Sequence, residues 1–274
     1  MKNLGLIGLA AAALVPSAAD ADPLVVRGDR LFVTAEVNGH QVEALLDSAA
    51  ELSFADKGAA QQLGLGIGEE VMARGSGGNQ GAYVAPAADI SAIGIKLKGV
   101  PVGVTDLGDI SARLIGKRVI FILGHDFFAA SRLSIDIEGG AIEQFASDTT
   151  PVGVELSVTD HDGISSIPVE VGGLKAMADF DLGNGTGVLI SKSFAERLRL
   201  PVVGMEPAGG IGGSKLREVV FLPSLTIAGR RFEHVRCRVD PQSNAGDLNI
   251  GVGLLRYFLI VTDFGAGKVW LSQH

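Results

Sequence analysis

The sequence predicts an all-β protein that consists of two similar halves in one chain. Four blocks of sequence recur in the same order at a nearly constant offset, which indicates an internal repeat. The best-matched block is typical of a β-hairpin in both copies. Hydrophobic residues make up 47% of the chain and charged residues 20%, so the chain is too apolar to be a disordered segment.

The first repeated block contains the hairpin. Residues 37–47 align with residues 171–181 without a gap. In each copy, alternating apolar residues lie on both sides of a tight Asn-Gly or Gly-Gly turn, and the block ends in an aspartate. A period of two around such a turn is typical of two antiparallel strands. We therefore expect Asp47 and Asp181 to occupy equivalent places at the ends of two apolar strands.

Three further blocks follow in each copy. A helix-like stretch comes first, and in the second copy Ser193 and Glu196 have the spacing of a capping box. A glycine-rich segment and then a closing apolar block with a glycine come next. The helix-like stretches end at residues 62–65 and 197–200, the glycine-rich segments are residues 74–78 and 209–213, and the closing blocks are residues 122–128 and 249–255, which continue into residues 133–136 and 260–263.

The copies are separated by a polar stretch, residues 146–151, which ends in proline and is the expected linker. It divides the chain into an N-terminal lobe, residues 22–150, and a C-terminal lobe, residues 151–274. Each lobe has about 125 residues, which is a normal size for a small β-rich domain.

Residues 1–21 have the pattern of a signal peptide. Met1 and Lys2 form a short basic region, and residues 4–14 are an uncharged apolar run. This run is shorter than the roughly 20 residues that a membrane-spanning helix needs. Small residues precede Ala21, so we expect cleavage after Ala21, with Ala19 as the alternative. We expect an exported protein, periplasmic or alternatively secreted, with no stable membrane anchor.

Composition excludes several classes of function. The net charge is −8 and no run of Lys or Arg occurs, so we expect no nucleic-acid partner. Cys237 is the only cysteine, which leaves no internal disulfide and no cysteine-based metal site. We expect it in the core. The five histidines show no paired ligand spacing, and no Gly-x-Ser-x-Gly occurs. Metal-dependent and serine hydrolases are thus disfavoured, and we expect no metal and no cofactor.

The two repeated aspartates indicate a shared acid–base site. An isolated charge at the end of an apolar strand is costly to bury. If the lobes pack about a pseudo-twofold axis, Asp47 and Asp181 can meet at its centre. Carboxylates about 3 Å apart share one proton over a range of pH. The charged member can then take a proton from water while the neutral member donates to a carbonyl oxygen.

With these residues the sequence resembles the retropepsin-like aspartyl proteases, as a tandem, exported member. The family pattern is two hydrophobic residues, Asp, Thr or Ser, then Gly or Ala, with two hydrophobic residues and Gly later. Residues 45–49 with 122–124 fit this pattern well, and residues 178–183 with 249–251 fit it less well. The resemblance implies two lobes, each a small closed β-barrel with one short helix, and an inter-lobe cleft that hydrolyses a peptide or protein substrate. It also implies a monomer, because the fusion replaces dimerisation.

The resemblance assigns roles to individual residues. Asp47 and Asp181 are the expected catalytic pair, supported by the residues that directly follow them. The glycine-rich segments correspond to flaps over the cleft, or alternatively are ordinary hairpin loops. The residues expected to support the pair are Ser48, Ala49, Leu182 and Gly183, and those expected in the flaps are Gly75, Gly77, Gly78, Gly210, Gly212 and Gly213.

Leu182 departs from the family pattern, because the family places Thr or Ser there and uses its hydroxyl to bond the other lobe. An alternative function is therefore a catalytically silent peptide-binding protein that uses the same cleft. A structural secreted domain is a third hypothesis. Asp136 and Asp263 also match between the copies, but each precedes a glycine turn and is expected to be structural. Asp179 should share a face with Asp181 by strand alternation, and the sequence assigns it no role.

Overall fold

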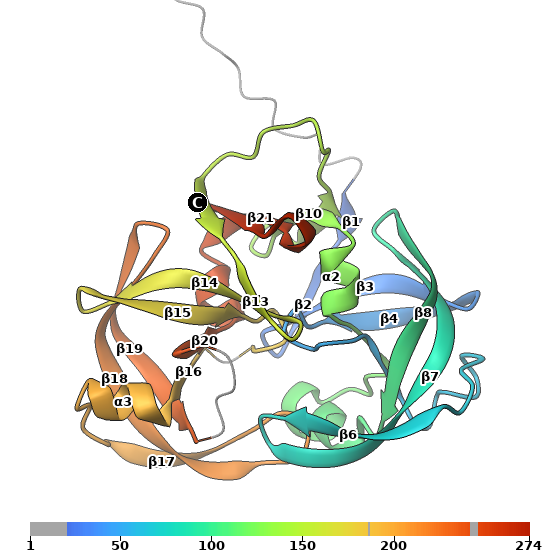
Figure 1. Cartoon of the computed structure of the whole chain (residues 1–274), viewed down its shortest axis with the longest axis horizontal. Helices are drawn as coiled ribbons and strands as arrows, with labels where there is room; N and C mark the ends of the chain where they lie inside the picture. Colours follow the sequence, from blue (N-terminus) through green and yellow to red (C-terminus); the bar gives the residue numbers. More distant parts are fainter. Residues whose placement is uncertain (1–20, 186, 242–245) are drawn as a thin grey trace, which may run out of the picture.

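The computed structural model describes residues 21–185, 187–241 and 246–274. Strands account for 55% of these residues and helices for 10%, so the predicted all-β class is confirmed. Figure 1 shows two strand-rich halves side by side, with a smaller sheet above and between them. The signal peptide predicted for residues 1–21 lies, apart from its last residue, outside the described residues.

The first half is an eight-stranded sheet with the order β2-β3-β4-β9-β5-β8-β7-β6. An additional pairing of β3 with β7 closes six of these strands into a barrel. Its strands are β2 (Val25–Arg27), β3 (Arg30–Val37), β4 (His40–Leu46), β5 (Phe54–Asp56), β6 (Glu69–Gly75), β7 (Gly78–Ala92), β8 (Ile95–Thr105) and β9 (Phe121–Leu123).

The second half repeats this topology strand for strand, with the order β13-β14-β15-β20-β16-β19-β18-β17 and a closing pairing of β14 with β18. Its strands are β13 (Thr159–His161), β14 (Ile164–Val171), β15 (Leu174–Phe180), β16 (Val188–Ser191), β17 (Gly204–Ala208), β18 (Lys215–Ile227), β19 (Arg230–Asp240) and β20 (Leu248–Ile250). The two halves are therefore two lobes of one architecture.

A third sheet joins the lobes, with the order β1-β11-β10-β21-β22-β12. At its centre β10, from the first half of the chain, pairs antiparallel with β21, from the second, and Ile135 lies opposite Ile260. Its strands are β1 (Asp22–Pro23), β10 (Arg132–Asp136), β11 (Ala141–Gln144), β12 (Val154–Ser157), β21 (Phe258–Asp263) and β22 (Lys268–Gln273).

Helices are few and short. A π-helical turn, η1, directly follows α1, and α2 and α4 follow the closing strands β9 and β20 at equivalent places. None of the helices within the described residues is long and apolar enough to cross a membrane. The helices are α1 (Gly108–Ile110), η1 (Ser111–Ile115), α2 (His125–Ala129), α3 (Lys192–Arg197), α4 (Val252–Leu255) and the 3-10 turn η2 (Phe264–Ala266).

The predicted hairpins are confirmed. Val37 pairs with His40 and Val171 with Leu174, so each connection is a two-residue turn. Both central residues have positive φ in each turn, 49° and 82° at Asn38-Gly39 and 55° and 88° at Gly172-Gly173. Asn and Gly tolerate this backbone best, which is why the sequence pattern marks the turns.

Two local predictions are wrong. The helix-like stretch of the first copy is a series of turns over residues 57–64, because Gly58 and Gly64 leave too few good helix formers to continue one helical turn. In the second copy the cap is Ser191 and not Ser193. Strand β16 ends at Ser191 and α3 begins directly after it, so the Ser191 hydroxyl accepts a hydrogen bond from Phe194 N at 3.2 Å.

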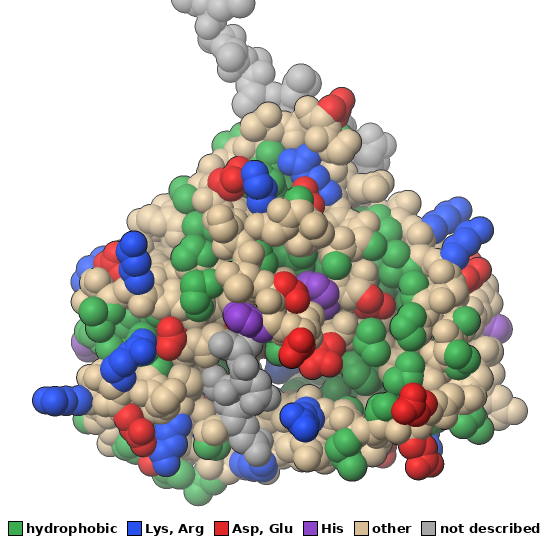
Figure 2. Space-filling model, in the orientation of Figure 1, with side chains coloured by type: hydrophobic (Ala, Val, Ile, Leu, Met, Phe, Trp, Pro, Cys, Tyr) green, Lys and Arg blue, Asp and Glu red, His purple; other side chains and the backbone are tan. Residues whose placement is uncertain are grey.

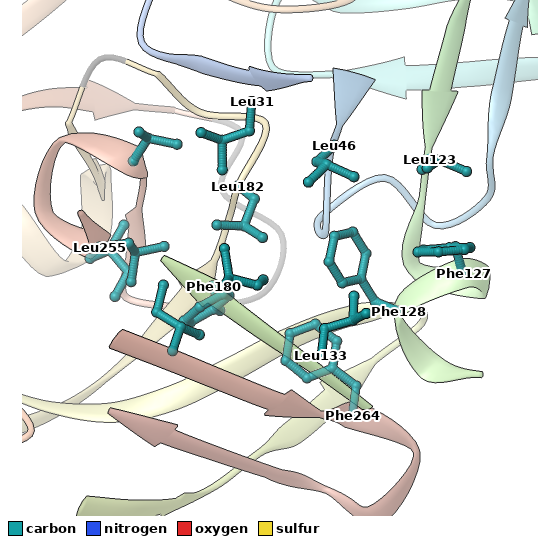
Figure 3. Packing of buried hydrophobic residues seen from close by; sticks show 14 of the residues in the cluster. Leu31, Leu46, Leu123, Phe127, Phe128, Leu133, Phe180, Leu182, Leu255 and Phe264 are labelled. Atoms are coloured by element: carbon teal, nitrogen blue, oxygen red, sulfur yellow. The ribbon is translucent and has the colours of Figure 1, made fainter. Parts of the chain in front are cut away.

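One hydrophobic cluster runs through both halves and the third sheet. Figure 3 shows its central part, where apolar side chains from both halves of the chain face one another. Cys237 is fully buried, and burial raises the pKa of its thiol to about 12, so its predicted place in the core is confirmed. The core therefore holds the ends of β4 and β15 in fixed positions.

We predict that the pairing of β10 with β21 stabilises the whole molecule. Ile260→Ala removes a side chain that is 0% exposed and should lower the free energy of unfolding by about 2–5 kcal/mol, measured by urea denaturation. Leu259→Ala, in the same strand but 43% exposed, is the control and should cost less than about 1 kcal/mol. Equal losses in the two variants would contradict this role of the β10–β21 pairing.

Candidate active site

Equivalent strands position the two aspartates. Asp47 directly follows β4 and Asp181 directly follows β15. Each strand pairs in parallel with the closing strand of its lobe. The next hydrogen bond in each ladder is made by the aspartate itself: Asp47 N donates to Leu123 O and Asp181 N to Ile250 O, both at 3.0 Å. Both aspartates therefore lie at the same position relative to the last residue of the closing strand in their lobe.

The two aspartates lie close together. A Cβ atom placed on Gly183 would collide with the Asp47 carboxylate, so Asp47 packs on the backbone two residues after Asp181. Both side chains are half-buried. Burial, followed by the negative charge of Asp181, raises the pKa of Asp47 to about 7. Burial also raises the pKa of Asp181. Two such neighbouring acids hold a proton at a pH where an exposed aspartate is ionised.

The two carboxylates receive different hydrogen bonds. Asp47 Oδ1 accepts one from Ala49 N at 3.2 Å. Asp181 Oδ1 accepts from Gly183 N at 2.8 Å and Asn184 N at 2.9 Å, and its Oδ2 accepts from Asn249 Nδ2 at 2.7 Å. These three donors oppose the effect of burial on the pKa of Asp181. These donors favour the charged form of Asp181.

Ser48 ties the two lobes together beneath the carboxylates. Its buried hydroxyl donates to Phe180 O at 2.7 Å and accepts from Leu182 N at 3.0 Å. Leu182, at the equivalent place in the second lobe, is fully buried and lies in the apolar cluster with Leu31, Phe180 and Leu255, as Figure 3 shows. The junction is therefore held by a hydroxyl on one side and by apolar packing on the other.

Both glycine-rich segments are hairpin turns, and the two turns touch. Gly75 pairs with Gly78 at the end of the β6–β7 hairpin, and Ala208 pairs with Lys215 at the end of the β17–β18 hairpin. Gly77 N donates to Ile211 O at 3.0 Å and Gly210 N to Ser76 Oγ at 2.7 Å. Cβ atoms on Gly75, Gly77 or Gly212 would collide with the backbone of the opposite turn. Gly78 and Gly213 lie in the same turns, and Gly213 N donates to Gly210 O.

Figure 2 shows this face of the molecule hollowed at its centre, between the two halves and above the strands that end in the glycine-rich turns. Histidine and acidic side chains lie around the hollow. A separate cavity of about 650 Å³ is lined by Asp56, Lys57, Asp106 and Arg118, among others. Neither Asp47 nor Asp181 lines it, so it lies apart from the two carboxylates.

Two arginines hold the touching turns reciprocally. Arg113, on η1 of the first half, donates to Gly209 O at 2.7 Å and Gly210 O at 3.0 Å in the second half. Arg217, on β18 of the second half, donates to Ser76 O in the first half and forms a buried ion pair with Asp240 at 3.0 Å. The side chain of Ile211 also packs against an apolar cluster of the first half that includes Phe32, Leu45, Ile110 and Ile122.

Three further aspartates that the sequence analysis considered bond neighbouring groups of their own lobe. Asp136 accepts from Gly139 N at 2.6 Å and Asp263 from Ala266 N at 3.2 Å, so the prediction that both belong to turns is confirmed. Asp179 lies opposite Ser166 in the β14–β15 pair and accepts its hydroxyl hydrogen bond at 2.6 Å. Burial raises the pKa of Asp179 to about 6. Within the described residues no three His, Cys, Asp or Glu side chains gather as a metal site would require.

Sequence reasoning assigned no role to four residues of the site. Asn249 and Arg30 lie near the aspartates, and Arg113 and Arg217 lie at the touching turns. A local signal existed for Asn249, which replaces Ile122 of the first copy inside an apolar block. For Arg30 the signal was weak: it is a charged residue at the start of strand β3, most of whose residues are buried. Arg113 and Arg217 carry no local signal, because each contacts backbone 96 to 141 residues away in the chain.

Comparison with known proteins covers the first half. Residues 33–127 match the family model described as aspartyl protease. The match runs from β3 to α2 and includes Asp47, Ser48, the β6–β7 hairpin and Gly124. No curated protein was found to match the chain. The first half is therefore similar to aspartyl proteases.

We predict that Asn249 lowers the pKa of Asp181. Asn249→Ile, which installs the residue found at this place in the first lobe, removes the donor to Oδ2 and should raise the pKa of Asp181 by about one unit or more. Carboxyl ¹³C NMR titration measures this value. Ile122→Leu, the volume-conserving control at the equivalent place, should leave it unchanged. An unaltered Asp181 titration in Asn249→Ile would contradict this assignment.

We predict that Arg113 holds the two turns together. Arg113→Ala removes two charge-assisted hydrogen bonds and should increase amide hydrogen exchange at Gly77 and Gly210 by about tenfold or more. Asp109→Ala is the control, because it removes the ion pair of Arg113 on its own segment and keeps the bonds to Gly209 and Gly210. Unchanged exchange in Arg113→Ala would show that the turns hold one another without the arginine.

Proposed function

We propose that the chain is an aspartic endopeptidase that hydrolyses peptide bonds with a water molecule activated between Asp47 and Asp181. The observation that carries the proposal is the approach of the two carboxylates, each at the end of an equivalent strand, with the pKa of both raised. The match of residues 33–127 to aspartyl protease supports a protease-like function.

The different hydrogen bonds of the two aspartates support different roles. Asp181, with three donors, is the ionised member and takes a proton from the water. Asp47, with a pKa of about 7, carries the shared proton and donates it to the carbonyl oxygen as the water oxygen bonds to the carbonyl carbon. When the C–N bond breaks, the proton on Asp181 passes to the leaving nitrogen and Asp47 regains a proton from the hydroxyl oxygen.

The glycine-rich turns act as two flaps in this proposal. A peptide lies extended between the flaps and the carboxylates, and the flap backbone hydrogen-bonds to the peptide as an added strand would. Closure of the flaps excludes water, which strengthens the electrostatic interactions of the aspartates with the reacting carbonyl. The small residues Ala49 and Gly183 let the peptide approach the carboxylates closely.

The remaining features of the proposal come from the sequence. The signal-peptide pattern predicted for residues 1–21 supports an exported protein, periplasmic or secreted, and the resemblance supports peptides or unfolded proteins as its substrates. The fusion of two lobes supports a monomer, because both aspartates belong to one chain. Leu182 favours the alternative, a peptide-binding protein without turnover, since this lobe lacks the second hydroxyl.

The test is cleavage of an unfolded protein mixture by residues 22–274. Asp47→Asn and Asp181→Asn should each lower the rate by about 10²–10⁴-fold or more, because each removes an acid–base group. In wild type, kcat/KM should fall as the pH rises through about 7, where Asp47 loses its proton. It should fall again on acidification, at a pH above the ordinary value of 3.8, where Asp181 becomes protonated.

Two matched controls accompany the test. Asp136→Asn and Asp263→Asn change turn aspartates and should retain turnover when the protein is folded. Well-folded wild type that cleaves nothing between pH 3 and 8 contradicts the enzyme and leaves the peptide-binding alternative.

A further inference from the structure

Arg30 is a buried arginine close to the two aspartates. It is the first residue of β3 and only 7% exposed. Burial lowers the pKa of its guanidinium, while the negative charges of Asp181 and Asp47 raise it. Within the described residues Arg30 forms no ion pair, so its guanidinium nitrogens lie more than 4.0 Å from the carboxylate oxygens of both aspartates. Arg30 is thus a cation beside the proposed reaction centre with no carboxylate in contact.

Most of the hydrogen-bonding capacity of Arg30 is unused. A guanidinium has five N–H donors. Within the described part of the chain, Arg30 makes one hydrogen bond, from Nη1 to Gly28 O at 3.0 Å. A Cβ on Gly185 would collide with the same Nη1, so the guanidinium also packs against the backbone of the second lobe. The side chain is therefore held in place with donors left for another group.

The internal repeat shows why Arg30 has no carboxylate partner within the described residues. Gly185, which faces Arg30, is the fourth residue after Asp181, and the fourth residue after Asp47 is Glu51. Arg30 precedes Asp47 by the same number of residues as Ile164 precedes Asp181. At these two positions the first lobe therefore has a cation, Arg30, and an acid, Glu51, whereas the second lobe has uncharged residues at both. Glu51 itself lies against Gly163, whose added Cβ would be 3.2 Å from Glu51 Cα.

We propose that Arg30 binds a carboxylate of the substrate, so that the site prefers acidic peptides. The inference rests on the proposed function and names the class of substrate that fits it. The nitrogens of Arg30 that bond no described protein group still reach solvent, so a ligand can replace the water there. A guanidinium matches a carboxylate through two parallel hydrogen bonds. The carboxylate belongs to an acidic side chain near the scissile bond or to the end of a short peptide.

The first experiment compares matched peptides. Each pair differs only by Glu or Gln at one position, scanned along both sides of the cleaved bond, with free or amidated C-termini. Wild type should prefer Glu at one position by about 10- to 100-fold in kcat/KM, through a lower KM. A preference for the free over the amidated C-terminus alone would assign the carboxylate to the peptide end. Equal rates for every pair would overturn the inference.

Variants then assign the preference to Arg30. Arg30→Gln should abolish it, and Arg30→Lys, which keeps the charge without the planar fork, should retain a smaller part. Each variant is measured at its own optimum pH, because Arg30 also lowers the pKa of both aspartates. Glu51→Gln is the matched control and should leave the preference unchanged. A preference that survives in a folded Arg30→Gln would overturn the inference.

A binding arm separates this inference from the proposed function. Asp181→Asn, with its full mature chain, is titrated with the same fluorescent peptide pairs, with and without Arg30→Gln. Tighter binding of the Glu peptide that depends on Arg30, in a protein whose wild type cleaves nothing, supports the carboxylate site and contradicts only the protease. Cleavage without any Glu preference in rate or binding contradicts only the carboxylate site.

Discussion

The packing of the Asp47 carboxylate on the backbone of Gly183 is the constraint on which the rest of the structure depends. Two acids can approach this closely only if strands β4 and β15 end at equivalent positions and no side chain lies between them. The backbone hydrogen bonds from Asp47 N to Leu123 O and from Asp181 N to Ile250 O fix those positions. The β10–β21 pairing and the Ser48 hydroxyl then keep the lobes from separating. Burial supplies the chemical result, because it raises the pKa of both acids.

Fusion of the lobes permits asymmetry at equivalent positions. Asn249 stands where the first lobe has Ile122, and Leu182 stands where it has Ser48. A symmetric pair of acids would share the proton equally, whereas the added donor to Asp181 favours the charged form there. The loss of one hydroxyl is offset locally, because Leu182 is fully buried in the cluster that joins the lobes. The two acids can therefore have separate tasks without any change in the fold.

The sequence predicts those parts of the molecule that depend on local periodicity. The hairpins at Asn38-Gly39 and Gly172-Gly173 follow from alternation and from turn residues that accept positive φ. The prediction of a helix in the first helix-like stretch was wrong, because the sequence pattern alone overestimates the helical stability of a short segment with two glycines. The contacts of Arg113 and Arg217 could not be predicted, since they join segments 96 to 141 residues apart and end on backbone carbonyls. Such contacts produce no recognisable pattern in the sequence.

The contacts between the two glycine-rich turns explain how two exposed hairpin ends are held against each other. Two interlobe backbone or hydroxyl hydrogen bonds, two arginines and the packing of Ile211 hold the turns together. A ligand opens them only if its own contacts are more favourable than those it displaces. In the proposed function an extended peptide meets this condition, because its backbone can replace the hydrogen bonds of the glycine-rich turns. Under the proposed substrate class, an acidic residue that reaches Arg30 adds a charge-assisted contact to the one hydrogen bond that Arg30 makes within the described residues. Under these two proposals, affinity for the peptide and selection of its charge come from different parts of the same site.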